Sequence, residues 1–175
     1  DPVQISAEIL QEITEKVFPV CNDAAGERMR EVIEDARLAQ DSVGGVIEAA
    51  AIGLPVGLGE PMFDGLESKL AAILYAIPAV KGVEFGKGFA AAALMGSENN
   101  DPFYYDADGR VKTSTNHHGG SLGGISSGMP LVLRTAFKPT PSISQEQQTI
   151  GLDTRQNETI RIMGRHDPCI VPRAV

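Results

Sequence analysis

The sequence is short of the residues that mark disulfide frameworks, zinc sites and membrane spans. It has no tryptophan, and its two cysteines, Cys21 and Cys169, lie far apart without the spacing of paired metal ligands. We therefore expect two reduced thiols, as in a cytoplasmic protein, and no zinc site. No apolar run is long and uninterrupted enough to cross a bilayer, and no signal peptide is visible. Because the chain starts at Asp1 without a methionine, we expect a fragment or a processed product.

Positive charge is also scarce. The chain has 15 lysines and arginines against 23 aspartates and glutamates, which leaves a net charge of −8. This balance argues against non-specific binding to nucleic acid or to an anionic membrane surface. An anionic ligand would therefore need a local basic cluster. The length of 175 residues corresponds to about one domain with a substantial core.

The hydrophobic periodicity predicts an α+β fold, in which helices are mixed with antiparallel strands. Helices are expected at residues 5–18, 23–40 and 64–77, with Asp23 as one N-cap and with Asp64 and Glu67 as a capping box. Strands are expected at residues 42–54, 80–86, 89–95, 131–137, 148–152 and 158–163, the first of them buried. Residues 97–114 carry turn signals and are expected to form an exposed hairpin.

The most distinctive stretch is residues 116–142, NHHGGSLGGISSGMPLVLRTAFKPTPS, in which a glycine-rich loop leads into an alternating strand. Glycines let backbone N–H groups converge on an anion, and the strand delivers the positive charge of Lys138. Thr140 and Ser142 add hydroxyl donors between prolines of fixed φ. The glycine spacing matches neither a P-loop nor a dinucleotide fingerprint. We predict an anion site here; the alternative is a flexible glycine loop beside an ordinary edge strand.

A second polar cluster, GRHDPC, follows the last predicted strand. Arg165, His166 and Asp167 place a cation, an imidazole and a carboxylate side by side, which suits phosphate binding and proton transfer. The alternative is a turn with an internal pair between Arg165 and Asp167. The adjacent His117 and His118 do not predict a metal site, because neighbouring side chains diverge and no carboxylate or cysteine stands at ligand spacing.

Four segments follow one another along nearly the whole chain: ARLAQDSVGGVIE, AIPAVKGVEFGKGF, HHGGSLGGISSGMPLVLRTAFKPTPSI and GRHDPCIVPRAV. In this order they resemble chorismate synthases. One such motif could arise by chance, but four collinear ones do not. The resemblance implies the fold of that family, a helical layer packed with antiparallel sheets as a β-α-β sandwich.

The resemblance also implies an activity. Chorismate synthases are lyases that eliminate phosphate from enolpyruvylshikimate phosphate to form chorismate, the last common step of the shikimate pathway of aromatic amino acid biosynthesis. They use reduced FMN, which transiently supplies an electron to the allylic substrate and helps to remove a proton, without net redox change. Some members reduce the flavin with NADPH and others rely on a partner. The implied protein is a cytoplasmic homotetramer.

The family's site residues can be carried over by position. The residues that match its flavin contacts are Gly123, Lys138, Pro139, Thr140, Pro141, Ser142 and Arg165. Arg165 also matches the arginine beside the substrate phosphate, and Asp167 matches the aspartate proposed to assist proton transfer at the flavin N5. An asparagine-alanine pair that touches FMN in many bacterial members is Pro78-Ala79 here, so no asparagine contact is expected.

The resemblance further implies that residues 1–175 form a single partial domain, the C-terminal part of a chorismate synthase without its N-terminal half and last helix. The family's GESHG segment, its second catalytic histidine and an arginine-serine pair are not found. His117 and His118 belong to the glycine loop and do not replace the catalytic histidines. We therefore expect no activity from this chain alone. The alternatives are a non-catalytic flavin- or phosphate-binding module of the same fold, and a structural unit whose loop is disordered without its other half.

Overall fold

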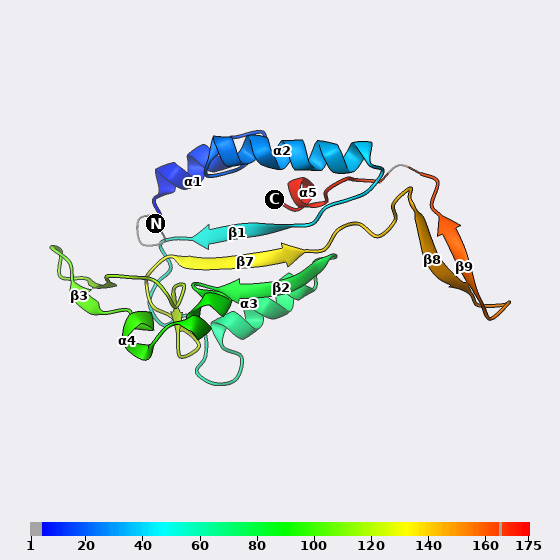
Figure 1. Ribbon diagram of the computed structural model, residues 1–175. Helices are drawn as coiled ribbons and strands as arrows, with labels where there is room; N and C mark the ends of the chain where they lie inside the picture. Colours follow the sequence, from blue (N-terminus) through cyan, green and yellow to red (C-terminus); the bar gives the residue numbers. More distant parts are fainter. Residues whose placement is uncertain (1–4, 165) are drawn as a thin grey trace. The chain divides into compact units, whose positions relative to one another are not determined.

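The computed structural model describes residues 5–164 and 166–175. Helices are mixed with antiparallel sheets, which confirms the predicted fold class (Figure 1). The chain divides into two compact units. The first holds residues 5–15 and Val46–Ala136, and the second holds Lys16–Gly45 and Phe137–Val175. The single partial domain expected over residues 1–175 stays a prediction.

The first unit is built on a three-stranded sheet. Its strands stand in the order β1 (Gly45–Ala51), β7 (Leu131–Phe137) and β2 (Val80–Phe85), and β7 runs opposite to both neighbours (Figure 1). β7 and β2 confirm two predicted strands. Leu131, Val132 and Phe137 of β7 are buried. Because β7 is the central strand, the alternative of a glycine loop beside an edge strand is wrong.

β1 is an edge strand, whereas the sequence predicted a buried strand at residues 42–54. Its side chains are half-buried or exposed, and Val46 is 61% exposed. An edge strand has a partner along one side only, and its other side stays open. The small apolar residues of this segment therefore indicated a strand correctly but did not indicate burial.

All three predicted helices are present, with shorter spans. They are α1 (Ala7–Thr14), α2 (Asp23–Leu38) and α3 (Leu66–Tyr75). α1 ends before the predicted residue 18, with Glu15 as its C-cap. Within the first unit, α3 packs against β2 (Figure 1).

Two predicted helix caps are wrong. Asn22 caps α2, and its side chain accepts a hydrogen bond from a first-turn backbone N–H at 2.9 Å, so Asp23 is the first helical residue instead of the N-cap. The N-cap of α3 is Gly65, which has no side chain to accept a hydrogen bond. Asp64 adopts a φ of +60° one residue earlier, so it does not form the predicted capping box with Glu67.

A 3₁₀-helix replaces the strand predicted at residues 89–95. This element, η1 (Gly88–Ala93), is followed by the short helix α4 (Gly96–Asn99). Two features turn the chain here: Gly88 has a φ of +51°, and the Glu84 carboxylate accepts a hydrogen bond from the backbone N–H of Phe89 at 3.0 Å. The run of alanines also favours a helical over an extended backbone.

The hairpin predicted in residues 97–114 is confirmed. Its antiparallel strands are β3 (Phe103–Tyr105) and β4 (Val111–Thr113). The Asp106 carboxylate shapes the turn by accepting hydrogen bonds from the backbone N–H groups of Asp108 and Arg110 at 3.0 and 2.8 Å. All three residues of β3 are exposed, as expected for an exposed hairpin.

The second unit contains α2, a two-stranded sheet and a final short helix. β8 (Glu146–Gly151) and β9 (Gln156–Arg161) form an antiparallel pair that confirms the two predicted strands, each beginning two residues earlier than expected. α5 (Val171–Ala174) follows the GRHDPC segment. Cys21 is exposed and Cys169 is buried, and both are free thiols, as predicted. Among the described residues, no helix has the length and apolar character needed to cross a membrane.

The backbone of Ala79 offers a test of local strain in the first unit. Ala79 has a φ of +75°, a conformation that is unfavourable for a residue with a Cβ and easy for glycine. Ala79→Gly is expected to raise the free energy of unfolding by about 0.5–1 kcal/mol in urea titrations. Ala71→Gly, inside α3, is the control and should lower it by about 1 kcal/mol. Destabilisation by both substitutions would contradict the strained conformation.

Candidate functional site

The glycine loop, residues 117–128, lies in the first unit and leads into β7. It contains two short paired strands, β5 (Ser121–Leu122) and β6 (Ile125–Ser126). Gly120 has a φ of +84°, and a Cβ there would lie 2.5 Å from the carbonyl O of Pro130. Only glycine allows this close approach. At Gly123, between the paired strands, a Cβ would meet nothing within 4 Å, so this residue faces open space.

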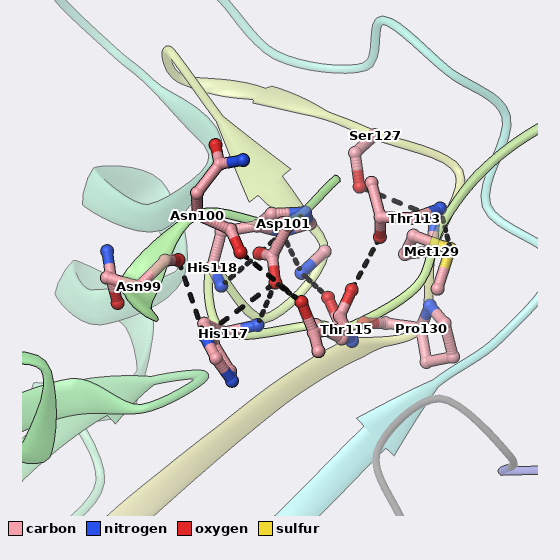
Figure 2. Close-up of polar contacts among 12 residues, drawn as sticks. Asn99, Asn100, Asp101, Thr113, Thr115, His117, His118, Ser127, Met129 and Pro130 are labelled. Atoms are coloured by element: carbon pink, nitrogen blue, oxygen red, sulfur yellow. Dashed lines mark hydrogen bonds and ion pairs between the residues drawn. The ribbon is translucent and has the colours of Figure 1, made fainter. Parts of the chain in front are cut away.

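A carboxylate of the chain itself occupies the first backbone amides of the glycine loop. Figure 2 shows Asp101 among residues of this loop. One oxygen of Asp101 accepts hydrogen bonds from the Thr115 hydroxyl at 2.5 Å and from the backbone N–H of His117 at 2.8 Å. The other oxygen accepts from the backbone N–H of His118 at 3.0 Å. At these two amides, therefore, the predicted anion nest holds Asp101.

The hydrogen bonds to Asp101 determine its charge. Its side chain is only 4% exposed, and this burial acts to raise the pKa of the carboxyl group. The hydrogen bonds from the Thr115 hydroxyl and from the backbone N–H groups of His117 and His118 outweigh burial, so the pKa lies below its usual value. Asp101 is therefore ionised at neutral pH.

His118 lies against the same carboxylate. Its Nδ1 accepts a hydrogen bond from the backbone N–H of Gly120 at 2.9 Å, and its Nε2 is 3.3 Å from Asp101 Oδ2. Burial lowers the pKa of His118, nearby Asp101 acts to raise it, and His117 lowers it further. The net shift is downward, so the ring is neutral at neutral pH. Since Nδ1 is an acceptor, the ring proton is on Nε2; this atom is buried near Asp101 but, among the described residues, has no hydrogen-bond partner.

The lysine turn, residues 138–142, belongs to the second unit. Lys138 and Thr140 are half-buried, and Ser142 is exposed. Within the part of the chain that the structure describes, neither the Lys138 ammonium nor the hydroxyls of Thr140 and Ser142 have a hydrogen-bond or ion-pair partner. These are the donors that the sequence predicted for an anion.

The segment 42–44 holds the lysine turn in place. The Ser42 hydroxyl donates to the carbonyl O of Thr140 at 2.6 Å. Gly44 lies so close that a Cβ would be 3.2 Å from the Pro139 ring and would collide with the carbonyl O of Phe137. Only a glycine fits at this position.

The same segment also holds the predicted proton-transfer motif. The backbone N–H of Val43 donates to the carbonyl O of Pro168 at 2.8 Å, and Val43 forms a parallel bridge with Cys169. The carbonyl O of Asp41, the residue just before this segment, lies 3.2 Å from His166 Nε2. The second unit thus brings the lysine turn and the His166–Cys169 motif against one short stretch of chain.

Asp167 forms an ion pair with Arg173; the pair with Arg165 that the sequence suggested lies outside the described residues. Its carboxylate lies 3.0 Å from the Arg173 guanidinium, and the side chain is 32% exposed. Arg165, predicted to contact flavin and substrate phosphate, lies outside the described residues. Gly123 is in the first unit, whereas Lys138, Asp167 and the rest of the lysine turn are in the second.

Sequence reasoning missed several residues that position these motifs. Asp101 was read only as part of an Asp-Pro turn signal, and Ser42 and Gly44 only as part of a strand. A second ion pair, between Arg134 of β7 and Glu84 of β2 at 2.7 Å, was also missed. An aspartate among asparagines and prolines gives no local sign of burial, because its donors are 14 to 17 residues away.

Of the described residues, no three histidine, cysteine or carboxylate side chains form a metal-binding group.

The family comparison covers both motifs and nearly the whole chain. The family model described as chorismate synthase matches residues 3–175. The chain belongs to the chorismate synthase family. It is 58% identical over 156 residues to a chorismate synthase of Dehalococcoides mccartyi, covering 89% of this chain and 43% of that protein. It is 51% identical over 175 residues to the chorismate synthase of Thermococcus gammatolerans, covering 99% of this chain and 49% of that protein.

A solved structure extends this family match to the fold. A crystal structure of chorismate synthase superposes with a TM-score of 0.70 at 32% identity, covering 78% of this chain and 43% of that one. The chain thus spans about half the length of the chorismate synthases that it matches. The resemblance inferred from the four sequence segments is confirmed at the level of family and fold.

The depressed pKa of His118 predicts a pH dependence of stability. Its folded-state pKa lies below the ordinary value of about 6.5, so its contribution to stability is complete above that value and is lost as the pH falls through the folded-state pKa. We expect the free energy of unfolding, measured in urea, to fall between pH 7 and about pH 5. His118→Gln should lose this part of the decline, and the control His166→Gln, in the other unit, should retain it. An unchanged decline in His118→Gln would contradict the assignment.

Proposed function

We propose that the chain provides part of the active site of a lyase that eliminates phosphate from enolpyruvylshikimate phosphate and forms chorismate. In this reaction one C–H bond and one C–O bond break, a proton and phosphate leave, and a double bond forms, so there is no net oxidation. The observation that carries the proposal is the pairing of two motifs on the segment 42–44. One motif supplies free donors for an anion, and the other supplies a carboxylate for proton transfer.

The lysine turn fits reduced FMN. Lys138 supplies a positive charge, and Thr140 and Ser142 supply hydroxyl donors without partners among residues 5–164 and 166–175. Pro139 and Pro141 fix the backbone between these donors, so little ordering is needed on binding. At Gly123 the open space around the backbone lets a ligand approach closely. When bound, reduced FMN supplies an electron transiently to the allylic substrate and helps in removal of the proton.

Asp167 and Arg165 are proposed to act on the reacting groups. The Asp167 carboxylate is partly exposed, and its contact with Arg173 orients it, so it can accept and relay a proton. For Arg165 the proposal rests on residue type and family position, since a guanidinium binds a phosphate dianion through two parallel hydrogen bonds.

The remaining properties are inferred from family membership. We infer a homotetramer in the cytoplasm, with NADPH or a partner protein as the source of electrons for the flavin. We also infer that the chain by itself does not turn over the substrate, because Gly123, the lysine turn, Arg165 and Asp167 match only part of the family's site. A non-catalytic flavin- or phosphate-binding module is the competing function, and turnover separates the two.

FMN binding tests the lysine turn. Lys138→Ala removes the only charge of the turn, so its FMN dissociation constant should rise by about tenfold or more, as expected for the loss of a hydrogen bond to a charged group. The measurement is a fluorescence titration of the chain with FMN. Lys69→Ala, an exposed lysine on α3, is the matched control and should bind like the unchanged chain. Equal affinities for the Lys138→Ala and unchanged chains would contradict this site.

Phosphate release tests the reaction. The chain is placed in a chimera, where it replaces the matching residues of the Thermococcus gammatolerans chorismate synthase. With chemically reduced FMN under anaerobic conditions, we expect phosphate release from enolpyruvylshikimate phosphate by the chimera and none by the chain alone. Asp167→Asn should lower the turnover of the chimera by about 100-fold or more.

The control for this loss is Asp153→Asn, an exposed carboxylate between β8 and β9, which should leave turnover unchanged. A folded chimera without activity would contradict the proposed function. Full activity of Asp167→Asn would contradict the role of that residue alone. Turnover by the chain alone would contradict the inferred inactivity.

A further inference from the structure

The Asp101 carboxylate is more completely hydrogen-bonded than a surface turn requires. Three donors reach its oxygens, the Thr115 hydroxyl at 2.5 Å and the amides of His117 and His118 at 2.8 and 3.0 Å. The His118 ring adds a fourth polar group at 3.3 Å (Figure 2). Burying a charge is costly unless such donors compensate for lost water, and here two of the donors are backbone amides of the glycine loop.

We propose that Asp101 is a positioning residue that fixes the glycine loop before any ligand binds. Its carboxylate takes the place of an external anion at the amides of His117 and His118. The relevance of this role to catalysis rests on the proposed function, because the same loop carries the proposed flavin contact, Gly123. The effect of Asp101 on the loop is a property of the ligand-free chain and does not depend on flavin.

The His118 ring links Asp101 to the next turn of the loop. Its Nδ1 accepts the backbone N–H of Gly120 at 2.9 Å, and its Nε2 lies 3.3 Å from Asp101 Oδ2 without a hydrogen-bond partner among the described residues. The buried Asn116 supplies a second acceptor for that N–H at 2.9 Å, and its amide group donates to the carbonyl O of Pro130 at 2.8 Å. The carboxylate thus binds two amides of the loop directly, and the His118 ring beside it, together with Asn116, accepts the third.

Asparagine cannot replace Asp101 in this arrangement. An ionised carboxylate accepts at both oxygens, whereas the amide of asparagine accepts at one end and donates at the other. In Asp101→Asn the NH₂ group would face either the donors at His117 and Thr115 or the donors at His118. The substitution keeps the size of the side chain and removes acceptors, which makes it a specific probe.

Amide hydrogen exchange on the ligand-free chain tests the proposal. In the unchanged chain the amides of His117, His118 and Gly120 should be protected. Asp101→Asn should speed their exchange by about tenfold or more, and Thr115→Val, which removes one donor and keeps the carboxylate, should give a smaller rise at the same amides. Asp108→Asn, a carboxylate that is 71% exposed in the β3–β4 turn, is the matched control and should change none of them.

The His118 ring supplies a readout that a general loss of packing would not reproduce. Nitrogen-15 spectra of the unchanged chain should show a neutral ring with its proton on Nε2, and Thr115→Val should keep this tautomer while exchange rises. If Asp101→Asn does not fold, the amide exchange of Thr115→Val tests the proposal. Unchanged exchange at His117 and His118 in the folded variants would overturn the proposal. So would inorganic phosphate that shifts these two amide signals in the unchanged chain, because the nest would then be open to an external anion.

FMN titration separates this inference from the proposed function. Weaker FMN binding by Asp101→Asn, with the exchange results above, supports both. Failure of the unchanged chain and of the chimera to bind FMN would overturn the proposed flavin site, while the exchange results would still decide the role of Asp101.

Discussion

A buried charge must be fully hydrogen-bonded, and in the first unit this requirement organises the glycine loop. Asp101 meets it by accepting from two backbone amides of the loop and from Thr115. Glycines alone would make this loop flexible. The carboxylate compensates the amides of His117 and His118, and the next amide, that of Gly120, is accepted by His118 and Asn116. The central strand β7 begins where this loop ends.

The second unit follows a different constraint, close backbone packing. Gly44 leaves no room for a Cβ beside Phe137 and Pro139, and Ser42 and Val43 form hydrogen bonds to two motifs that are distant in sequence. The backbone of the lysine turn is held by these contacts, while its side-chain donors have no partner among the described residues. Side chains on a backbone that is already held in place need little further ordering, so these donors are preorganised.

The sequence predicted most elements and the residue types of the site, but few of the contacts between them. β7, the β3–β4 hairpin and the β8–β9 pair were predictable because alternation and turn residues are local signals. η1 was not, since its turn depends on the Glu84 side chain reaching Phe89. The roles of Asp101 and of the segment 42–44 depend on partners far along the chain, which composition and periodicity do not reveal. Lys138 and Asp167 were predicted from their residue types and from the family resemblance, and their roles stay predictions.

The burial of Cys169 gives the second unit a natural chemical reporter. Its thiol lies 3.9 Å from the carbonyl O of Gly44, whereas the thiol of Cys21 is exposed. A thiol reagent should therefore modify Cys21 at once and reach Cys169 only when the contact with the segment 42–44 opens. The slow phase of such a reaction records how often the His166–Cys169 motif separates from the segment 42–44.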